Sequence, residues 1–300
     1  ASALGPRQER VLPDFRDLAG MTTEREALEV AAAGGHHVMM IGPPGSGKSM
    51  LAERLPSILP PMAVEEMVEV TAIHSAAGIS GGEVVDSRPF IAPHPSLTRA
   101  AMIGGGGGIP TPGVVSHAHH GVLFLDEASE IQAHVLDALR IPLEKREVRL
   151  TRFHREVVYP ADFQLVLAAN PCACQRIKGQ CTCRSPQRAK HLSNVSGPLK
   201  DRLDLFITTS SETAVLSPMG AEPSSAIAER VAAARERGIA VVLVTHNPHH
   251  AFLVGDHFTI LKLGHQELDA PRSEVTLEEL THQMAGGGEL EALSHELGRD

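Results

Sequence analysis

The 300-residue sequence lacks features that define several broad classes of protein. No apolar run approaches the roughly 20 residues that a membrane-spanning helix needs, and the N-terminal residues do not show the basic-then-apolar order of a secretory signal peptide. Cysteine is scarce, and all four cysteines fall between Cys172 and Cys183, too close together for disulfides that join distant parts of a fold. These absences argue against a helical membrane protein and a disulfide-framed secreted domain, and they favour a cytoplasmic location.

Charge is distributed unevenly along the chain. The formal net charge is −9, but residues 1–210 carry 21 basic and 22 acidic side chains, whereas residues 211–300 carry 6 and 14. Residues 140–202 reverse the balance, with 13 basic against 5 acidic side chains. A local basic excess suits a polyanionic partner, although ordinary solvated surface charge accounts for it equally well. With 42% hydrophobic residues, the chain is able to form one large or two modest domains, and the change of charge near residue 210 indicates two parts of different character.

The segment Gly42–Ser49 matches the pattern G-x-x-x-x-G-K-[ST] of a phosphate-binding loop. The apolar run at 37–41 predicts a buried strand before the loop, and the spacing of Met50, Leu51 and Leu55 predicts a helix after it. In such a loop the backbone N–H groups face the phosphates of ATP, Lys48 reaches the β- and γ-phosphates, and the Ser49 hydroxyl binds Mg²⁺. The expected nucleotide-binding residues are Gly42, Pro43, Pro44, Gly45, Ser46, Gly47, Lys48, Ser49 and Met50.

Two later apolar runs of strand length end in polar residues. Residues 121–125 lead into Asp126 and Glu127, and residues 163–169 lead into Asn170. Beside a phosphate-binding loop, Asp126 would hold the Mg²⁺ shell and Glu127 would polarise the attacking water. Asn170 would orient that water or sense the γ-phosphate, although an asparagine after a strand is also a common turn residue.

The remaining patterns predict the surrounding elements. Helical spacing favours helices at 22–33, 64–74 and 130–144, and a final strand is expected at 205–208. Alternation at 147–158 predicts a hairpin whose tip region carries Arg149, Arg152, His154 and Arg155, side chains suited to nucleic acid phosphates. Residues 77–120 are rich in glycine, proline and histidine and predict a long insertion with short strands or mobile loops and no core element.

The four cysteines and one arginine are further candidates. Cys172, Cys174, Cys181 and Cys183 are spaced C-x-C-x₆-C-x-C, so they either close a tetrahedral Zn²⁺ site or are four free thiols in a loop; the C-x-C spacing is tighter than the usual C-x₂-C. Arg202 precedes the strand at 205–208. It either reaches the γ-phosphate in a neighbouring subunit as an arginine finger or forms a local ion pair with Asp201 or Asp204.

Over about residues 14–237 the chain resembles the magnesium chelatase-type AAA+ ATPases, specifically the ComM/YifB branch. The resemblance implies Walker A at Gly42–Ser49, Walker B at Asp126 and Glu127, sensor 1 at Asn170 and an arginine finger at Arg202. It also implies a homo-hexameric ring that hydrolyses ATP with Mg²⁺, acting either on single-stranded or branched DNA or, as a chelatase-type motor, on a protein partner. The matching segments lie at 31–37, 88–94, 104–113, 121–127, 170–172 and 196–205.

After Arg237 the chain departs from that family. Residues 238–300 resemble the end of a sugar-importer ABC ATPase, on the segments 241–251, 254–258 and 284–293. There His246 would be the switch histidine, but the partner motifs of that family are missing here, so we expect no nucleotide role for it. The family's helical lid with its sensor 2 arginine is replaced, which predicts nucleotide binding with weakened hydrolysis.

The expected fold class is α/β: a five-stranded parallel P-loop (AAA+) sheet with flanking helices, followed by a small acidic α/β segment. The expected organisation is an arm at 1–13, the ATPase core at 14–209, a linker and first lid helix at 210–237, and the C-terminal fragment at 238–300. Within the core we expect the insertion at 77–120, the hairpin at 147–158 and a cysteine knuckle at 172–183.

Overall fold

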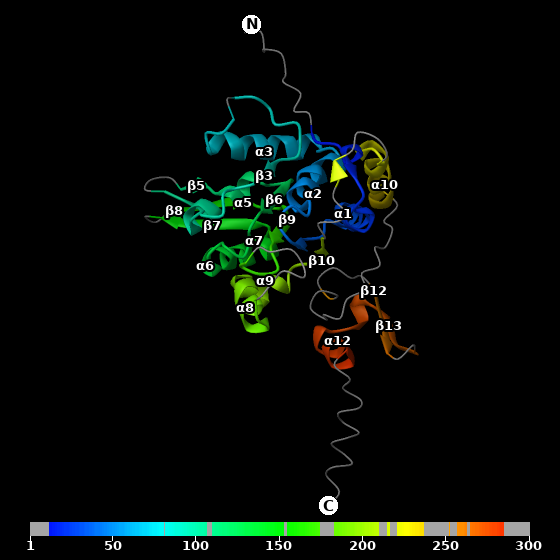
Figure 1. Ribbon diagram of the computed structural model, residues 1–300. Helices are drawn as coiled ribbons and strands as arrows, with labels where there is room; N and C mark the ends of the chain where they lie inside the picture. Colours follow the sequence, from blue (N-terminus) through cyan, green and yellow to red (C-terminus); the bar gives the residue numbers. More distant parts are fainter. Residues whose placement is uncertain are drawn as a thin grey trace, which may run out of the picture. The chain divides into compact units, whose positions relative to one another are not determined.

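The computed structural model describes residues 12–80, 82–106, 110–152, 155–174, 183–209, 215–216, 221–236, 252, 257–262 and 265–284 (Figure 1). The chain divides into two compact units, Ala1–Ile239 and Ala240–Asp300. Most of the expected arm, together with His154, Cys181 and His246, lies outside the described residues.

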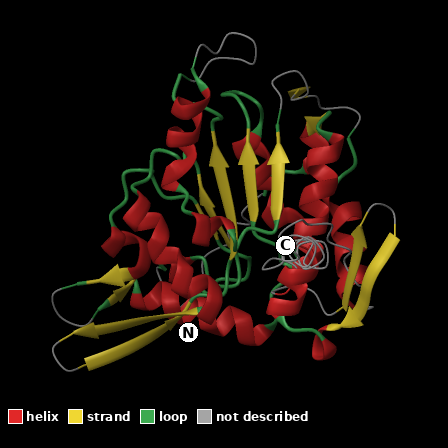
Figure 2. Ribbon diagram, turned by 90° about the horizontal axis from the view of Figure 1, so that it is seen from below, coloured by secondary structure: helices red, strands yellow, loops and turns green. Residues whose placement is uncertain are grey.

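A five-stranded parallel sheet forms the centre of the first unit. Its strand order is β10-β2-β9-β6-β3, and each neighbouring pair is parallel. Figure 2 shows these strands between helices. The predicted parallel P-loop architecture is therefore confirmed. The strands are β2 (Val38–Ile41), β3 (Phe90–Ile91), β6 (Val122–Leu125), β9 (Gln164–Ala169) and β10 (Leu205–Thr208).

Alternate residues of the central strands pack on opposite faces of the sheet. Leu123 and Leu125 belong to a first buried apolar cluster on one face, and Val122 and Phe124 belong to a second cluster on the other face. Because both faces are covered, these strands are continuous apolar runs in the sequence rather than alternating ones. The second cluster is completed by α1 (Thr22–Gly34), α2 (Lys48–Arg54), η2 (Leu55–Ile58) and α10 (Ser224–Glu236). The first is completed by α4 (Arg99–Ile103), α5 (Val114–His117), α6 (Ala133–Leu136), η3 (Asp137–Leu139), α7 (Arg140–Lys145) and α9 (Gly197–Lys200).

Smaller elements surround this core. The predicted hairpin is present as β7 (Glu147–Arg152) and β8 (Arg155–Pro160), which pair antiparallel. The predicted helix at 64–74 is α3 (Val64–Ala76). The others are η1 (Phe15–Asp17), β1 (Leu18–Ala19) paired with β11 (Val215–Leu216), β4 (Gly104–Gly105) paired with β5 (Thr111–Pro112), α8 (Ser185–His191) and η4 (Leu192–Asn194).

Residues 77–120 contain short strands, as one of the two predictions for them had it, but the prediction that they hold no core element is wrong. The short strand β3 lies in this segment and completes the central sheet beside β6. Met102 and Val115 are fully buried in one of the two core clusters. A two-residue strand between Pro89 and Pro93 is too short to leave a periodic pattern, so the sequence gives no sign of it.

The helix predicted at 130–144 is instead the succession α6, η3 and α7, and it begins at Ala133. Pro142 lies inside it, and its ring nitrogen has no hydrogen to donate to the carbonyl four residues earlier. The α-helical hydrogen-bond pattern is therefore interrupted there, and Asp137–Leu139 forms a tighter 3-10 turn. The apolar stripe is core as expected, because Val135, Leu136 and Leu139 are buried.

The second unit contains a two-stranded antiparallel sheet and a helix. Phe258, Val275 and Leu280 form its small apolar cluster, and the Phe252 and Phe258 rings stack with centroids 5.7 Å apart. The described residues of this unit thus include both strands and a helix. None of the helices in the described part of the chain is long and apolar enough to cross a membrane. The elements are β12 (His257–Lys262), β13 (His265–Pro271), η5 (Arg272–Glu274) and α12 (Leu277–Met284).

Buried histidines predict that the first unit loses stability in mild acid. Burial lowers the pKa of His36, His37, His117 and His119 below the usual 6.5. Between the lowered pKa and 6.5 the unfolded chain binds more protons than the folded chain, so the free energy of unfolding falls as pH falls. Each such histidine adds up to about 1.4 kcal/mol per pH unit to the slope.

Urea unfolding at pH 7.5, 6.5 and 5.5 measures this slope. We expect His119→Gln to reduce the slope and His134→Gln, at an exposed position, to leave it unchanged. A free energy of unfolding that stays level between pH 6.5 and 5.5 would contradict the prediction.

Candidate functional site

The loop Gly42–Ser49 joins the carboxyl end of β2 to α2, as predicted. A Cβ atom on Gly42 would lie 2.0 Å from Thr209 Oγ1 and 2.6 Å from the Thr209 carbonyl oxygen, so glycine is required at this close approach. Gly47, which precedes α2, has φ +82°, in the left-handed region that favours glycine. The first turn of a helix has N–H groups without intrahelical partners. The loop and α2 together therefore present the backbone donors that an anion requires.

Lys48 is buried and lies against the loop that precedes it. Its Nζ donates to the carbonyl oxygens of Gly42 at 2.8 Å and Pro43 at 2.9 Å. It also lies 3.3 Å from Asn170 Oδ1, which accepts a hydrogen bond from it. Burial lowers the pKa of Lys48, and the negative charge of Asp126 opposes that shift. The lysine thus connects the phosphate-binding loop to the residue that ends β9.

The other contact at this edge joins α2 to the end of β6. Ser49 Oγ donates to Asp126 Oδ2 at 2.9 Å, and the backbone N–H of Glu127 donates to Asp126 Oδ1 at 2.8 Å. Glu127 has φ +48° and is exposed. Hydroxyl and carboxylate oxygens are the ligands that Mg²⁺ prefers, so Ser49 and Asp126 fit that ion.

The structure therefore brings together Lys48, Ser49, Asp126 and Asn170, which the sequence predicted for one site. They come from the loop after β2 and from the carboxyl ends of β6 and β9, which meet at one edge because the strands are parallel. Met50 is different, because its side chain packs half-buried against an apolar cluster.

Sequence analysis missed Thr209, which follows β10 at the same edge. Its Oγ1 lies 2.6 Å from Ser46 Oγ in a buried hydrogen bond, and its backbone N–H donates to the Ile41 carbonyl oxygen at 2.9 Å. A polar residue directly after the strand predicted at 205–208 was the available signal. Through Thr209, the carboxyl end of β10 also contacts the phosphate-binding loop, as the ends of β6 and β9 do.

Arg202 forms an ion pair within the chain, with a partner that the sequence did not indicate. Its guanidinium donates to Glu144 Oε1 on α7 and to the Pro198 carbonyl oxygen. Burial and the like charge of Arg140 lower the pKa of Arg202. Asp204, one of the two predicted local partners, accepts the backbone N–H of His37 at 2.6 Å.

The hairpin places Arg149 on an exposed strand, where carboxylates surround it. Arg149 Nε donates to Glu147 Oε1 at 2.6 Å, and Arg149 Nη1 lies 3.6 Å from Glu156 Oε1. Its side chain nevertheless remains 62% exposed. Arg152 and Arg155 are opposite each other in the register of β7 and β8.

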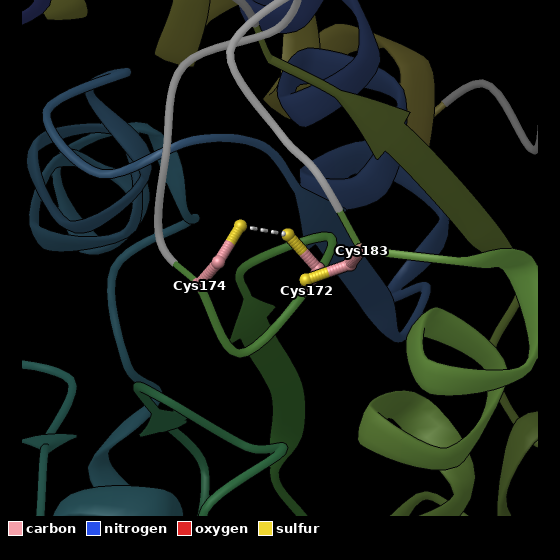
Figure 3. A group of neighbouring side chains, drawn as sticks. All are labelled: Cys172, Cys174 and Cys183. Carbon is pink, nitrogen blue, oxygen red and sulfur yellow. Dashed lines mark hydrogen bonds between the residues drawn. The ribbon is translucent and has the colours of Figure 1, made fainter.

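Two groups in the described part of the chain have metal-ligating atoms within 4.8 Å of one another. The first is Cys172, Cys174 and Cys183 (Figure 3). The fourth predicted cysteine, Cys181, lies outside the described residues.

The second group is Glu69, His119 and His120, and it is better described as a hydrogen-bonded cluster than as a metal site. The backbone N–H of Asp162 donates to His119 Nδ1 at 3.0 Å, so the proton of a neutral His119 ring is on Nε2. That Nε2 lies 3.0 Å from Glu69 Oε2 and donates to it. A nitrogen that carries a proton has no lone pair for a metal.

Comparison with known proteins gives a family for this chain. A family profile described as "Magnesium chelatase, subunit ChlI" matches residues 14–215. An uncharacterized protein of Mycobacterium tuberculosis is 50% identical over 227 residues, which are 74% of this chain and 45% of that protein. The protein YifB of Escherichia coli is 42% identical over 75% of this chain and 45% of its own length, and the competence protein ComM of Haemophilus influenzae is 40% identical over 74% and 45%.

The chain thus spans about half the length of the curated relatives that it matches. The profile ends at residue 215, and these comparisons do not support the predicted resemblance of residues 238–300 to a sugar-importer ABC ATPase. The matched region contains the phosphate-binding loop, Asp126, Glu127 and Asn170. The chain therefore belongs to the magnesium chelatase subunit ChlI family, and YifB and ComM are among its relatives.

Proposed function

We propose that the first unit binds ATP with Mg²⁺ and hydrolyses it. The observation that carries this proposal is the pair of contacts at one sheet edge, Ser49 to Asp126 and Lys48 to Asn170. Three segments far apart in the sequence supply these four side chains. Together they form a phosphate-binding loop, a lysine and an oxygen donor set for Mg²⁺, arranged as a P-loop ATPase requires.

Each residue then has a role at the bound nucleotide. The backbone of Gly42–Ser49 and the Lys48 ammonium would hold the phosphates, and Ser49 and Asp126 would hold a Mg²⁺ ion, which would neutralise charge on the phosphates. Glu127, exposed at the end of β6, accepts the proton of the attacking water. Asn170 orients that water beside the γ-phosphate.

The same proposal includes a homo-oligomeric ring in which Arg202 acts on the nucleotide of a neighbouring subunit. Arg202 lies three residues before the edge strand β10, and its side chain is 17% exposed. Arg202 must leave Glu144 to reach a phosphate in another subunit. The partly exposed Glu144 carboxylate therefore competes with that phosphate for the arginine.

We propose DNA as the macromolecule on which this ATPase acts. The basic excess over residues 140–202 and the hairpin β7–β8 support it. Arg149 is exposed on β7 and is able to contact DNA phosphates. The carboxylates of Glu147 and Glu156 compete with those phosphates for its guanidinium. The alternative client is a protein partner, as for a chelatase-type motor.

Steady-state ATP hydrolysis with and without single-stranded and branched DNA tests the function. Turnover stimulated by DNA supports the proposal, and stimulation by a protein partner alone would replace DNA as the client. Nucleotide binding without turnover would show that the chain is a binding module, as the replaced lid predicts.

Arg149→Ala is expected to weaken binding to single-stranded DNA and to reduce the slope of log K against log salt by about 0.7, the value for one lost phosphate contact. Arg16→Ala removes an exposed arginine from a different surface and serves as the control. Fluorescence anisotropy at several salt concentrations gives both quantities. If the two variants bind DNA with the same affinity and slope, the hairpin is not the contact surface.

A further inference from the structure

The segment between β9 and α8 holds three thiols that the proposed ATPase function does not use. Cys172 is 2% exposed and follows Asn170 by two residues. Cys174 lies in the same turn, and Cys183 lies just before α8. Figure 3 shows the three side chains directed toward one another.

The distances suit a thiolate metal site. Cys172 Sγ and Cys174 Sγ are 3.0 Å apart, and all three sulfur atoms lie within 4.8 Å of one another. A tetrahedral Zn²⁺ with Zn–S bonds of about 2.3 Å separates its sulfurs by about 3.8 Å. The 3.0 Å separation is shorter than that value and the other two separations are at most 4.8 Å, so small side-chain movements bring three sulfurs onto one ion.

The sequence around these cysteines is basic, although Arg176 and Lys178 lie outside the described residues. Residues 171–190 contain five basic side chains, Arg176, Lys178, Arg184, Arg188 and Lys190, and no acidic one. Positive neighbours stabilise the thiolate form, which is the form that binds metal.

From this geometry we propose that Cys172, Cys174 and Cys183 bind one Zn²⁺ ion, which ties the end of the central strand β9 to the start of α8. The ion closes a loop of chain next to Asn170 and is structural, because it lies among buried and half-buried sulfurs. Cys181 lies outside the described residues, and the structure assigns it no place in this site.

Metal analysis of the full chain, purified under reducing conditions and dialysed after addition of zinc, tests the site without reference to ATP. We expect about one zinc per chain. Cys172→Ser and Cys183→Ser are each expected to lower the content at least about fivefold. Glu69→Gln alters the other group with ligand atoms close together and is the matched control, which should keep the wild-type content.

Co²⁺ added to the unaltered chain gives a second measurement that does not depend on how the variants fold. Thiolate-to-cobalt charge-transfer bands and the d–d bands of tetrahedral Co²⁺ are expected, and zinc should remove them. Wild-type protein with less than about one fifth of a zinc per chain, or the same zinc content in the cysteine variants, would overturn the proposal. So would a thiol titration that finds these cysteines joined as disulfides in the unreduced protein.

Discussion

Replacing Lys48 with alanine is expected to remove most of the affinity of the first unit for ATP. A hydrogen bond to a charged group contributes about 1.5–3 kcal/mol, which is about 10- to 100-fold in Kd. Turnover should fall further, at least about 100-fold, because the lysine also neutralises charge on the γ-phosphate as the bond breaks. Isothermal titration with a non-hydrolysable ATP analogue and a steady-state phosphate assay measure the two effects.

The side chain of Lys48 is buried and donates to the Gly42 and Pro43 carbonyl oxygens, so its removal also affects the folded loop. Circular dichroism and thermal unfolding show whether the variant is folded. Lys145→Ala removes an exposed lysine near the end of α7 and should leave ATP affinity unchanged. A folded Lys48→Ala protein with wild-type affinity would refute the nucleotide site.

The sequence predicted the central sheet well where the strands are long and buried on both faces. Residues 122–125 and 164–169 are covered by helices on either side, so their apolar runs are unbroken and easy to recognise. The two-residue strand β3 could not be recognised in this way, because sheet pairing with β6 rather than local pattern defines it. The same reasoning explains the missed core residue Met102, which follows a stretch rich in proline and histidine.

The candidate site was predictable because parallel strands bring their carboxyl ends to one edge. Knowing that Gly42, Asp126 and Asn170 each follow a strand was sufficient to expect them together, and the contacts of Lys48 and Ser49 agree. Contacts that depend on side-chain packing were not predictable. The hydrogen bond between Thr209 and Ser46 and the ion pair between Arg202 and Glu144 join residues more than 50 positions apart without a motif.

These two contacts belong to one short segment of chain. Arg202 precedes β10 and Thr209 follows it, so a single strand carries the candidate finger at one end and a loop contact at the other. Thr209 also fills the space beside Gly42, where no Cβ fits. If Arg202 moved toward a neighbouring subunit, it would therefore pull on β10, whose other end is hydrogen-bonded to the phosphate-binding loop through Thr209.

Glu127→Gln is expected to stop hydrolysis while leaving ATP affinity within about twofold of the wild-type value. The amide has the size of the carboxylate but does not accept a proton at neutral pH, and general base catalysis contributes about 10²–10⁴-fold. Affinity should survive because Glu127 contacts Asp126 through its backbone N–H, which the substitution keeps, so the Mg²⁺ ligand stays in place. Glutamine also suits the left-handed backbone at φ +48° no worse than glutamate.

The experiment separates the role of Glu127 from that of Lys48, because one variant should bind ATP without turnover and the other should not bind. Glu130→Gln is the matched control, since Glu130 is exposed three residues later in the same turn region and has no place in the proposed site. It should retain wild-type turnover. If Glu127→Gln turns over ATP at the wild-type rate, Glu127 is not the base, and the acceptor of the water proton must be sought among the other groups at this edge. If it loses affinity as well, the carboxylate itself helps to hold the ion, and Asp126 and Glu127 act together as ligands.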